Sequence, residues 1–269
     1  MPSRLIRSCL LIALIAPCLF AGVFISVNIA PPALPVYVQP VCPGDGYIWT
    51  PGYWAWGPDG YYWVSGVWVL APTPGFLWTP GYWGWRGGLY VWNAGYWGPH
   101  VGFYGGVNYG FGYGGVGYAG GAWVGGVFSY NTAVSNVNVT VVHNTYIDRT
   151  VIVNNTTVVN RPSFNGPGGV AAQPTQTEMA AARERHFGPT QAQFNQEHTA
   201  GLNRANFYSV NRGHPNFTPA TGGGSHPNFA PAGGAHPYVA PAGGGAPPKP
   251  HYTKPKPPPP PPPKRGHGE

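Results

Sequence analysis

One short pattern, W-x-x-G-x-W, occurs four times in this chain and constrains its fold more than any other feature. Indoles spaced this closely must be buried against one another or held against a partner, because each exposes a large apolar surface when it is left in water. The four copies are Trp49–Trp54, Trp63–Trp68, Trp78–Trp83 and Trp92–Trp97. Any fold of this region must therefore place paired indoles, with a glycine between them, at one fixed spacing.

The segments that connect the copies predict hairpins. Gly57-Pro-Asp-Gly60 joins the first copy to the second, and Arg86-Gly-Gly-Leu89 joins the third to the fourth; both are short loops of hairpin type. The second copy reaches the third through Ala71-Pro-Thr-Pro-Gly75, where proline has no amide donor for sheet pairing. The structural unit is therefore a pair of copies, and the module contains two such pairs.

Reversal at these two loops predicts which aromatic residues face each other. Side chains alternate between the two faces of a strand, so the loop position fixes the register of each hairpin. The predicted pairs are Trp54 with Trp63, Trp56 with Tyr61, Trp83 with Trp92, and Trp85 with Tyr90. Cross-strand aromatic pairs stabilise antiparallel sheet, so we expect these pairs to hold the hairpins together.

The glycine of each copy suggests a turn within the motif. Thr50-Pro51-Gly52-Tyr53 and Thr79-Pro80-Gly81-Tyr82 fit a type II turn, in which the third residue has positive φ. The second and fourth copies lack the proline but keep glycine, as Gly66 and Gly95. We therefore predict that these glycines supply a backbone conformation that other residues avoid.

Composition separates this chain from ordinary enzymes and from charged disordered polymers. Charged residues make up 8% of it, against about 25% in ordinary globular proteins, and aromatic residues make up 15%. Much of the net charge of +7 comes from the C-terminal tail, where the cations are Lys249, Lys254, Lys256, Lys264 and Arg265. Nucleic-acid readers interleave cations with their aromatic rings. The tryptophan region lacks such cations, so we expect no nucleic-acid partner.

The N-terminus has the pattern of an export signal. Arg4 and Arg7 precede an apolar run over residues 10–20, and Ala21 offers a small residue for cleavage. We favour a cleaved signal at residues 1–21 over a retained membrane anchor. Cys18 follows a proline, which is a poor context for lipidation. Removal of the signal leaves Cys42 alone, so the mature chain has no internal disulfide. Residues 22–46 read as an extended linker.

Two β-rich segments follow the tryptophan module at residues 47–98. Residues 99–128 alternate glycine with aromatic residues and valine, and are either flexible or an extension of the sheet; such tracts also self-associate. Residues 129–165 are rich in valine, asparagine and threonine. The alternation of Val137, Val139 and Val141 with polar residues predicts a half-buried strand, and Asn154-Asn155 predicts a turn before another strand.

The C-terminal part changes character at residue 173. Capping boxes at Thr175–Glu178 and Thr190–Gln193 predict two short helices within residues 173–210, the first ending before Gly188 and the second running towards Tyr208. We expect these helices to pack weakly, because their apolar surface is small. Residues 211–269 hold three near-repeats that begin with His-Pro, and then a polyproline run flanked by lysines. Such a tail is expected to be disordered and extended.

The repeated motif resembles that of the WxxGxW repeat proteins of bacteria, also written YxWGxW. The resemblance covers residues 47–98 and implies an exported cell-envelope protein, periplasmic or associated with the outer membrane, without established enzymatic activity. It transfers no catalytic or ligand residue. Together with the patterns above, it predicts a mainly β fold: tandem aromatic antiparallel hairpins, a Val/Asn-rich β segment, short C-terminal helices and a disordered Pro/Gly-rich tail.

Two roles are open for the repeat residues. Our leading interpretation is structural, and it covers Trp49, Gly52, Trp54, Trp63, Gly66, Trp68, Trp78, Gly81, Trp83, Trp92, Gly95 and Trp97. In the alternative, Trp54, Trp63, Trp83 and Trp92 form exposed platforms on which sugar rings stack. Coplanar, solvent-facing indoles would favour the alternative, whereas buried indoles would count against it.

Three classes of function are open to this chain. The leading one is a non-enzymatic envelope protein with a structural or interaction role, whose partner is another envelope protein or cell-wall glycan. The second is a glycan-binding module, and the third is an enzyme. We predict no catalytic residues, no metal site and no cofactor: His143 and Asp148 lack a nucleophile or third ligand nearby, and the tail histidines lack tight spacing. Membrane contact is expected only through an uncleaved signal or peripherally.

Overall fold

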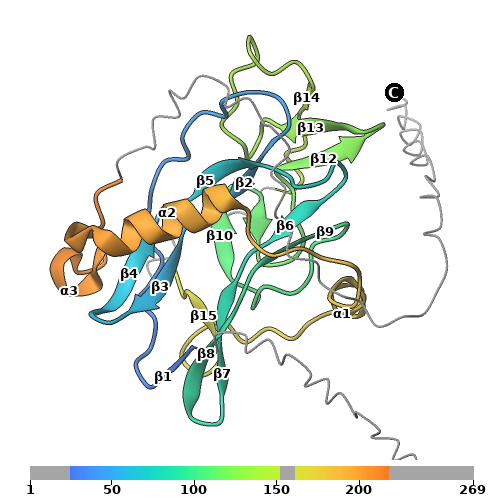
Figure 1. Ribbon diagram of the computed structural model, residues 1–269. Helices are drawn as coiled ribbons and strands as arrows, with labels where there is room; N and C mark the ends of the chain where they lie inside the picture. Colours follow the sequence, from blue (N-terminus) through green and yellow to red (C-terminus); the bar gives the residue numbers. More distant parts are fainter. Residues whose placement is uncertain (1–24, 152–160, 218–269) are drawn as a thin grey trace, which may run out of the picture. The chain divides into compact units, whose positions relative to one another are not determined.

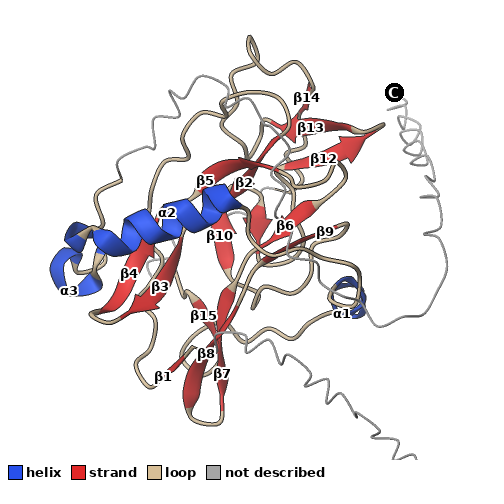
Figure 2. Cartoon of the chain, in the orientation of Figure 1, coloured by secondary structure: helices blue, strands red, loops and turns tan. Residues whose placement is uncertain are grey.

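The computed structural model describes residues 25–151 and 161–217, and these residues form the mainly β fold that the sequence predicts (Figure 1). The predicted signal segment, the strand expected after Asn154-Asn155 and residues 218–269 of the predicted tail lie outside the described residues. The prediction of disorder is wrong for residues 211–217, because Phe217 stacks on Tyr37 with ring centroids 5.1 Å apart. Figure 2 shows that the strands are short and belong to several small sheets rather than to one large one. The order of strands in the largest sheet is β1-β8-β7-β15.

The repeat region contains eight strands. They are β2 (Tyr47–Thr50), β3 (Tyr53–Gly57), β4 (Gly60–Val64), β5 (Val67–Leu70), β6 (Leu77–Thr79), β7 (Tyr82–Arg86), β8 (Leu89–Asn93) and β9 (Tyr96–Gly98). The other strands are β1 (Ser26–Val27), β10 (Asn108–Gly110), β11 (Tyr113–Gly114), β12 (Gly121–Val124), β13 (Val127–Asn131), β14 (Thr145–Tyr146) and β15 (Phe164–Asn165). The helices are α1 (Gln176–Ala181), α2 (Gln191–Leu202), the 3₁₀ helix η1 (Arg204–Asn206) and α3 (Tyr208–Asn211).

Each pair of motifs forms one long hairpin with a break in both arms. In the first hairpin the inner ladder β3·β4 and the outer ladder β2·β5 keep a single register on either side of the break. The second hairpin has the same plan, with β7·β8 inside β6·β9. All four predicted aromatic pairs are confirmed, and the register adds the pairs Trp49 with Trp68 and Trp78 with Trp97.

Both hairpins reverse where the sequence predicts. Gly57 pairs with Gly60, and Arg86 pairs with Leu89, so two residues make each turn. Gly87 and Gly88 have φ of +57° and +89°, the positive values that a primed hairpin turn requires at both central positions. The local turn chemistry alone therefore fixes the second reversal.

The prediction of positive φ for the motif glycines is wrong. Among the glycines of the described residues that have positive φ, none is Gly52, Gly66, Gly81 or Gly95. Glycine is required at these positions because neighbouring atoms leave no room for a side chain, and not because the backbone has positive φ. A Cβ placed on Gly66 would lie 2.4 Å from Cζ2 of Trp49, and one on Gly52 would lie 2.4 Å from Cζ2 of Trp63. Real Cβ atoms essentially never make contacts this short, so no other residue fits without movement.

The contact between glycine and indole is reciprocal within each hairpin. Gly52 lies against the first tryptophan of the second motif, and Gly66 lies against the first tryptophan of the first motif. The second hairpin repeats the arrangement: Cζ2 of Trp92 would be 2.5 Å from a Cβ on Gly81, and Cζ2 of Trp78 would be 2.4 Å from one on Gly95. The motif spacing therefore encodes a mutual fit between two copies, and one copy alone has no partner for its glycine.

In each hairpin, one cross-strand tryptophan pair lies on either side of the motif glycines, one in the outer ladder and one in the inner ladder. Ring centroids are 5.3 Å apart for Trp49–Trp68, Trp54–Trp63 and Trp83–Trp92, and 5.4 Å apart for Trp78–Trp97. Tilted and edge-to-face pairs at this distance are favourable arrangements of aromatic rings. The two hairpins thus have nearly the same internal packing.

The hairpins join through equivalent positions. Nε1 of Trp83 donates a hydrogen bond of 2.8 Å to the carbonyl oxygen of Trp54, which occupies the corresponding place in the first hairpin. The hydroxyl of Tyr113 lies 2.9 Å from the carbonyl oxygen of Trp78 and 3.3 Å from that of Trp49. Tyr113 comes from the Gly/aromatic segment, and its ring is fully buried. Residues 99–128 therefore contribute to the core, and the prediction of a flexible segment does not hold for the part around Tyr113.

The linker preceding the module also packs against the first hairpin. Nε1 of Trp54 donates to the carbonyl oxygen of Ala33, and Nε1 of Trp68 donates to that of Pro40. The hydroxyl of Tyr61 donates to the carbonyl oxygen of Ile29. Extended backbone offers its carbonyl groups to the indoles in this way, so these buried donors are satisfied.

The strand predicted at residues 137–141 is absent. The side chain of Asn138 accepts hydrogen bonds from the amide and hydroxyl of Thr140, and its carbonyl accepts from the amide of Val142. These local bonds form a turn and leave Val139 and Val141 exposed. Asparagine competes with sheet pairing through such contacts. Within the described part of residues 129–165, the regular strands are the last residues of β13, the whole of β14 and the whole of β15.

Both predicted capping boxes are confirmed, but the helices end early. α1 ends at Ala181 because the chain must extend to pair Phe187 with Trp97 through two backbone hydrogen bonds of 2.8 and 2.9 Å. α2 ends at Leu202, after which Asn203 leaves the helix and caps η1. The expected weak packing also needs correction, because α2 lies on the first hairpin: Ala200 is buried with Tyr62 and Phe207 (Figure 1).

We predict that Gly66→Ala destabilises the protein by about 2 kcal/mol or more, because the added Cβ would lie 2.4 Å from Cζ2 of Trp49 and 2.9 Å from the backbone nitrogen of Gly52, so that both must move. Urea unfolding followed by tryptophan fluorescence measures the change. Gly44→Ala is the matched control: a Cβ on Gly44 has no atom within 4 Å, so its effect should stay within about 0.5 kcal/mol. Equal losses in both variants would contradict this explanation of the motif.

We also predict that Gln193→Ala destabilises the protein more than Gln191→Ala. Oε1 of Gln193 accepts from the buried Nε1 of Trp97 at 2.9 Å and from the N-cap amide of Thr190 at 2.8 Å. Its removal leaves both donors without this acceptor, which should lower the free energy of unfolding by about 2 kcal/mol. Gln191 is exposed, and within residues 25–151 and 161–217 its side chain bonds only its helix neighbour Asn195. Similar unfolding midpoints for the two variants would show that α2 does not depend on this contact.

Candidate functional site

A cleft of about 570 Å³ lies between the two hairpins, beside α2. We call it the inter-hairpin cleft. Its lining consists of Ile25, Thr50, Pro51, Tyr53, Tyr62, Val64, Ser65, Val67, Trp78, Pro80, Gly81, Trp92, Ala94, Gly95, Tyr109, Pro189, Gln193, Phe194, Gln196, Glu197 and His198. Much of this lining comes from the breaks in the hairpin arms, where the motifs interrupt regular pairing. The same feature that packs the indoles therefore shapes the cleft.

One wall of the inter-hairpin cleft is aromatic. The rings of Tyr53 and Trp92 stack with centroids 5.0 Å apart and an interplanar angle of 18°. They come from different hairpins, so their contact closes the wall across the junction. Pro51 and Pro80, which occupy the same position in the two motifs, add flat apolar surface. Phe194 of α2 contributes a further ring that is 50% exposed.

The other wall is polar and belongs to α2. Gln193, Gln196 and Glu197 project from one side of the helix, because residues three and four apart lie on the same face. Nε2 of Gln196 donates to the carbonyl oxygen of Ser65 at 3.2 Å, which holds the helix to the first hairpin. Within the described residues, Nε2 of Gln193 and Oε1 of Gln196 have no hydrogen-bond partner. These amide atoms are available to a ligand.

Glu197 brings a negative charge close to two tyrosine hydroxyls. Burial, and secondarily the Glu197 carboxylate, hold the pKa of Tyr53 well above its usual value. Burial and the same carboxylate raise the pKa of Tyr62 to about 12. Both phenols therefore stay neutral and can donate to acceptors. Among the described residues that line the cleft, none is a lysine or an arginine.

The structure does not place the four proposed platform tryptophans as the alternative interpretation requires. Trp54, Trp63 and Trp83 are each 1% exposed, so none can present a ring face to a sugar. Each packs against its cross-strand partner and also against a further ring: Tyr208 for Trp54, Tyr37 for Trp63 and Tyr61 for Trp83. Trp92 alone is partly buried and lines the cleft. The exposed-platform form of the glycan hypothesis is therefore wrong for three of its residues, and Trp92 stacks on Tyr53 instead.

The residues of α2 that line the cleft have no signal in the sequence that marks them as part of a site. The capping box at Thr190 predicts the helix, and the spacing of Gln193, Gln196 and Glu197 places them on one face. Nothing in the local sequence, however, says which surface that face meets. The pairing of α2 with the first hairpin joins residues far apart in the chain, such as Gln196 and Ser65.

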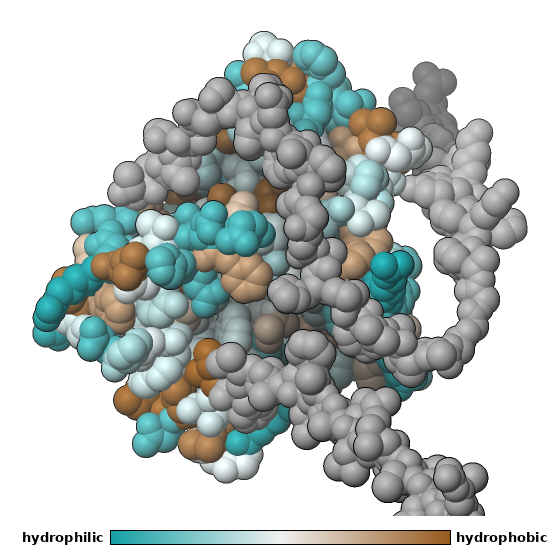
Figure 3. All heavy atoms as spheres, viewed as in Figure 1, coloured by the Kyte–Doolittle hydropathy of each residue, from teal (hydrophilic) through white to brown (hydrophobic). Residues whose placement is uncertain are grey.

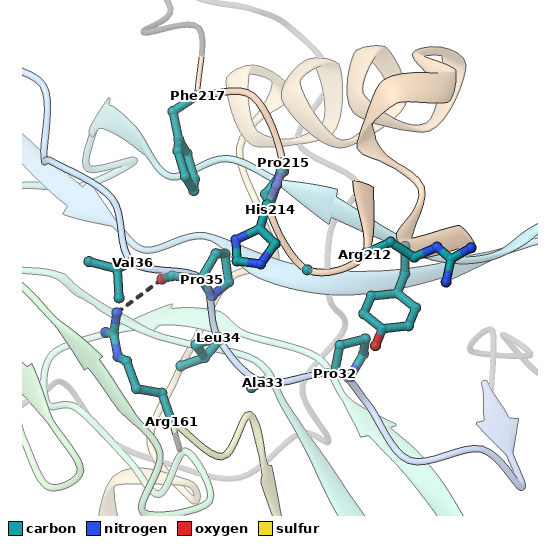
Figure 4. A pocket seen from close by; sticks show the side chains of 12 residues that line it. Pro32, Ala33, Leu34, Pro35, Val36, Arg161, Arg212, His214, Pro215 and Phe217 are labelled. Atoms are coloured by element: carbon teal, nitrogen blue, oxygen red, sulfur yellow. Dashed lines mark hydrogen bonds between the residues drawn. The ribbon is translucent and has the colours of Figure 1, made fainter. Parts of the chain in front are cut away.

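A second cavity of about 400 Å³ lies between residues 32–36, Arg161 and the segment after α3 (Figure 4). Nη1 of Arg161 donates to the carbonyl oxygen of Pro35 at 2.9 Å. Burial lowers the pKa of Arg161 from its usual value. The segment after α3 lines the opposite side of this cavity with Arg212, His214 and Phe217. The guanidinium of Arg161 is occupied by backbone, so this cavity has a weaker case as a ligand site.

Other candidate chemistry is sparse in the part of the chain that is described. His143 is exposed, and Asp148 accepts hydrogen bonds from the amide and hydroxyl of Thr150. No group of three or more His, Cys, Asp or Glu residues that could hold a metal ion occurs within residues 25–151 and 161–217. Cys42 is buried and free. None of the described helices has the length and apolar character that a membrane span needs.

Comparison with known families agrees with this division into two hairpins. Residues 44–69 and 74–97 each match the WXXGXW repeat. The chain therefore carries this repeat in two copies, and each copy corresponds to one hairpin of paired motifs. Neither a curated protein nor a solved structure matches the chain.

We predict that ionisation of the buried tyrosines Tyr37 and Tyr62 lowers the free energy of unfolding in alkaline solution. Burial raises the pKa of Tyr37 and of Tyr62 to about 12, above the value of about 10 in an unfolded chain. The folded state binds these protons more tightly, so the stabilisation is complete below about pH 10 and is lost as the pH rises towards about 12. Urea midpoints across this range, with tyrosinate absorbance, measure the loss. Tyr62→Phe should decline less steeply, and an unchanged slope would contradict this assignment.

Proposed function

We propose that this chain is an exported, non-enzymatic protein of the cell envelope with a structural or interaction role. The observation that carries the proposal is the burial of the repeat indoles. Every repeat tryptophan except Trp92 is buried, and the motif glycines fit against the leading tryptophans. The motif thus serves mainly to fold the chain upon itself, as expected of a scaffold whose repeat is a packing device.

The sequence outside the described residues supports the envelope location. An export signal precedes the module, and a proline-rich basic tail follows it. A tail of this composition suits an extended spacer that touches anionic envelope polymer in a salt-dependent way. The mature chain would keep a single cysteine, so its stability after export must come from packing and not from an internal disulfide. We place the mature protein in the periplasm or at the outer membrane.

Glycan binding is the second candidate function, and a specific observation supports it. The inter-hairpin cleft combines ring faces on one wall with amide and carboxylate groups on the other. This arrangement keeps Trp92 and does without the buried Trp54, Trp63 and Trp83. A binding role and a scaffold role are compatible, because the residues that line the cleft are few compared with those that pack the core.

We predict that the full chain, tagged at its C-terminus and expressed in bacteria, is recovered in the periplasmic or envelope fraction without residues 1–21. Mass spectrometry of the purified protein measures the cleavage. Replacing Leu11 and Leu14 together by arginine interrupts the apolar run, so this variant should remain uncleaved in the cytoplasm. Cytoplasmic recovery of the unchanged chain would contradict the proposed location.

A further inference from the structure

We propose that the inter-hairpin cleft is a binding site for a neutral saccharide, with Tyr53, Trp92 and Phe194 contacting its apolar face and Gln193, Gln196 and Glu197 contacting its hydroxyl groups. The inference deepens the second candidate function and rests on it for the class of ligand. It does not depend on where the protein is located in the cell.

The size and position of the cleft suit a small ligand. Its volume of about 570 Å³ falls within the range of about 300–1,000 Å³ that is usual for ligand sites. It is concave and mostly apolar, as ligand sites usually are, and it lies where the two hairpins and α2 meet. Both hairpins and α2 contribute to it, so a ligand would contact parts of the chain as far apart as Thr50 and His198.

The two walls together match the two kinds of surface on a sugar ring. A pyranose has apolar faces made of C–H groups and an edge made of hydroxyl groups. The stacked pair Tyr53–Trp92 covers one face of each ring, and the ring surface that remains lines the cleft. Phe194 offers an exposed ring from the helix side. Gln193 and Gln196 offer one free donor and one free acceptor, a combination that pairs with hydroxyl groups.

The charges in the cleft favour a neutral ligand. The lining has no lysine or arginine to neutralise a phosphate or a polyanion. Its carboxylate, Glu197, lies close to the tyrosines whose pKa values it raises, Tyr53 and Tyr62. The neutral phenols can donate to this carboxylate, which has further lone pairs for the hydroxyl groups of a ligand. A carboxylate in this setting accepts hydrogen bonds from hydroxyl groups well.

The test uses the full chain and a panel of soluble probes. The probes are the trimer of N-acetylglucosamine, cellotriose and maltotriose, with choline as a cationic probe of similar ring-binding chemistry. Isothermal titration measures affinity, and saturation-transfer NMR shows which sugar protons lie against the protein. We expect at least one trisaccharide to bind with a Kd of about 1 mM or tighter, with saturation strongest on ring C–H protons.

Two pairs of variants place the binding in the cleft. Phe194→Ala and Glu197→Gln should each weaken binding of that trisaccharide about tenfold, since each removes a ring contact or a charged acceptor. Their matched controls are Leu202→Ala, an exposed apolar residue of α2 outside the cleft, and Glu184→Gln, which lies beside His100. Both controls should bind within about twofold of the unchanged chain. Urea midpoints verify that all four variants fold.

Three outcomes would overturn the proposal. They are no binding of any trisaccharide by the folded chain, equal binding by the cleft variants and their controls, and binding of choline alone with loss in Glu197→Gln. The last outcome would identify a cation site. Fractionation reports on the envelope role separately, so an exported chain that ignores every probe would refute the saccharide site and leave the scaffold role intact.

Discussion

The fold of the repeat region depends on one reciprocal contact, in which the glycine of each motif lies against the first indole of its partner motif. A Cβ at any of the four motif glycines would lie 2.4–2.5 Å from an indole Cζ2 atom. The contact works in both directions within a hairpin, so two motifs are the smallest unit that satisfies it. The arrangement then buries the outer and inner tryptophan pairs together and leaves Trp92 partly accessible.

This constraint links packing to the candidate site. The breaks at the motifs separate β2 from β3 and β6 from β7, and residues at these breaks, including Pro51 and Pro80, line the inter-hairpin cleft. α2 then lies over the first hairpin and supplies polar groups. On the face shown in Figure 3, hydrophilic and hydrophobic residues mix over α2, so the helix brings polarity to an aromatic region that has almost no charge of its own. The binding function that we propose therefore draws on the helix as well as on the repeats.

Local signals predict the hairpins well and their tertiary setting poorly. Turn residues and strand alternation fix the pairs Trp54–Trp63 and Trp83–Trp92, because both act over a few residues. The role of the motif glycines is missed because positive φ and close packing both favour glycine, and only the neighbouring atoms distinguish them. Val139 looks like part of a strand until the side chain of Asn138 forms a turn. The position of α2 has no local signal, since Gln196 meets Ser65 across the fold.

A double-mutant cycle between Gly66→Ala and Trp49→Phe tests the central contact most directly. Phenylalanine lacks the indole atoms Cζ2 and Cη2, which would lie 2.4 and 2.8 Å from a Cβ at position 66. Free energies of unfolding from urea titration should show that the alanine is tolerated better when phenylalanine replaces Trp49, with a coupling of about 1 kcal/mol or more. Losses that add to within about 0.5 kcal/mol would contradict the reciprocal packing of glycine and indole.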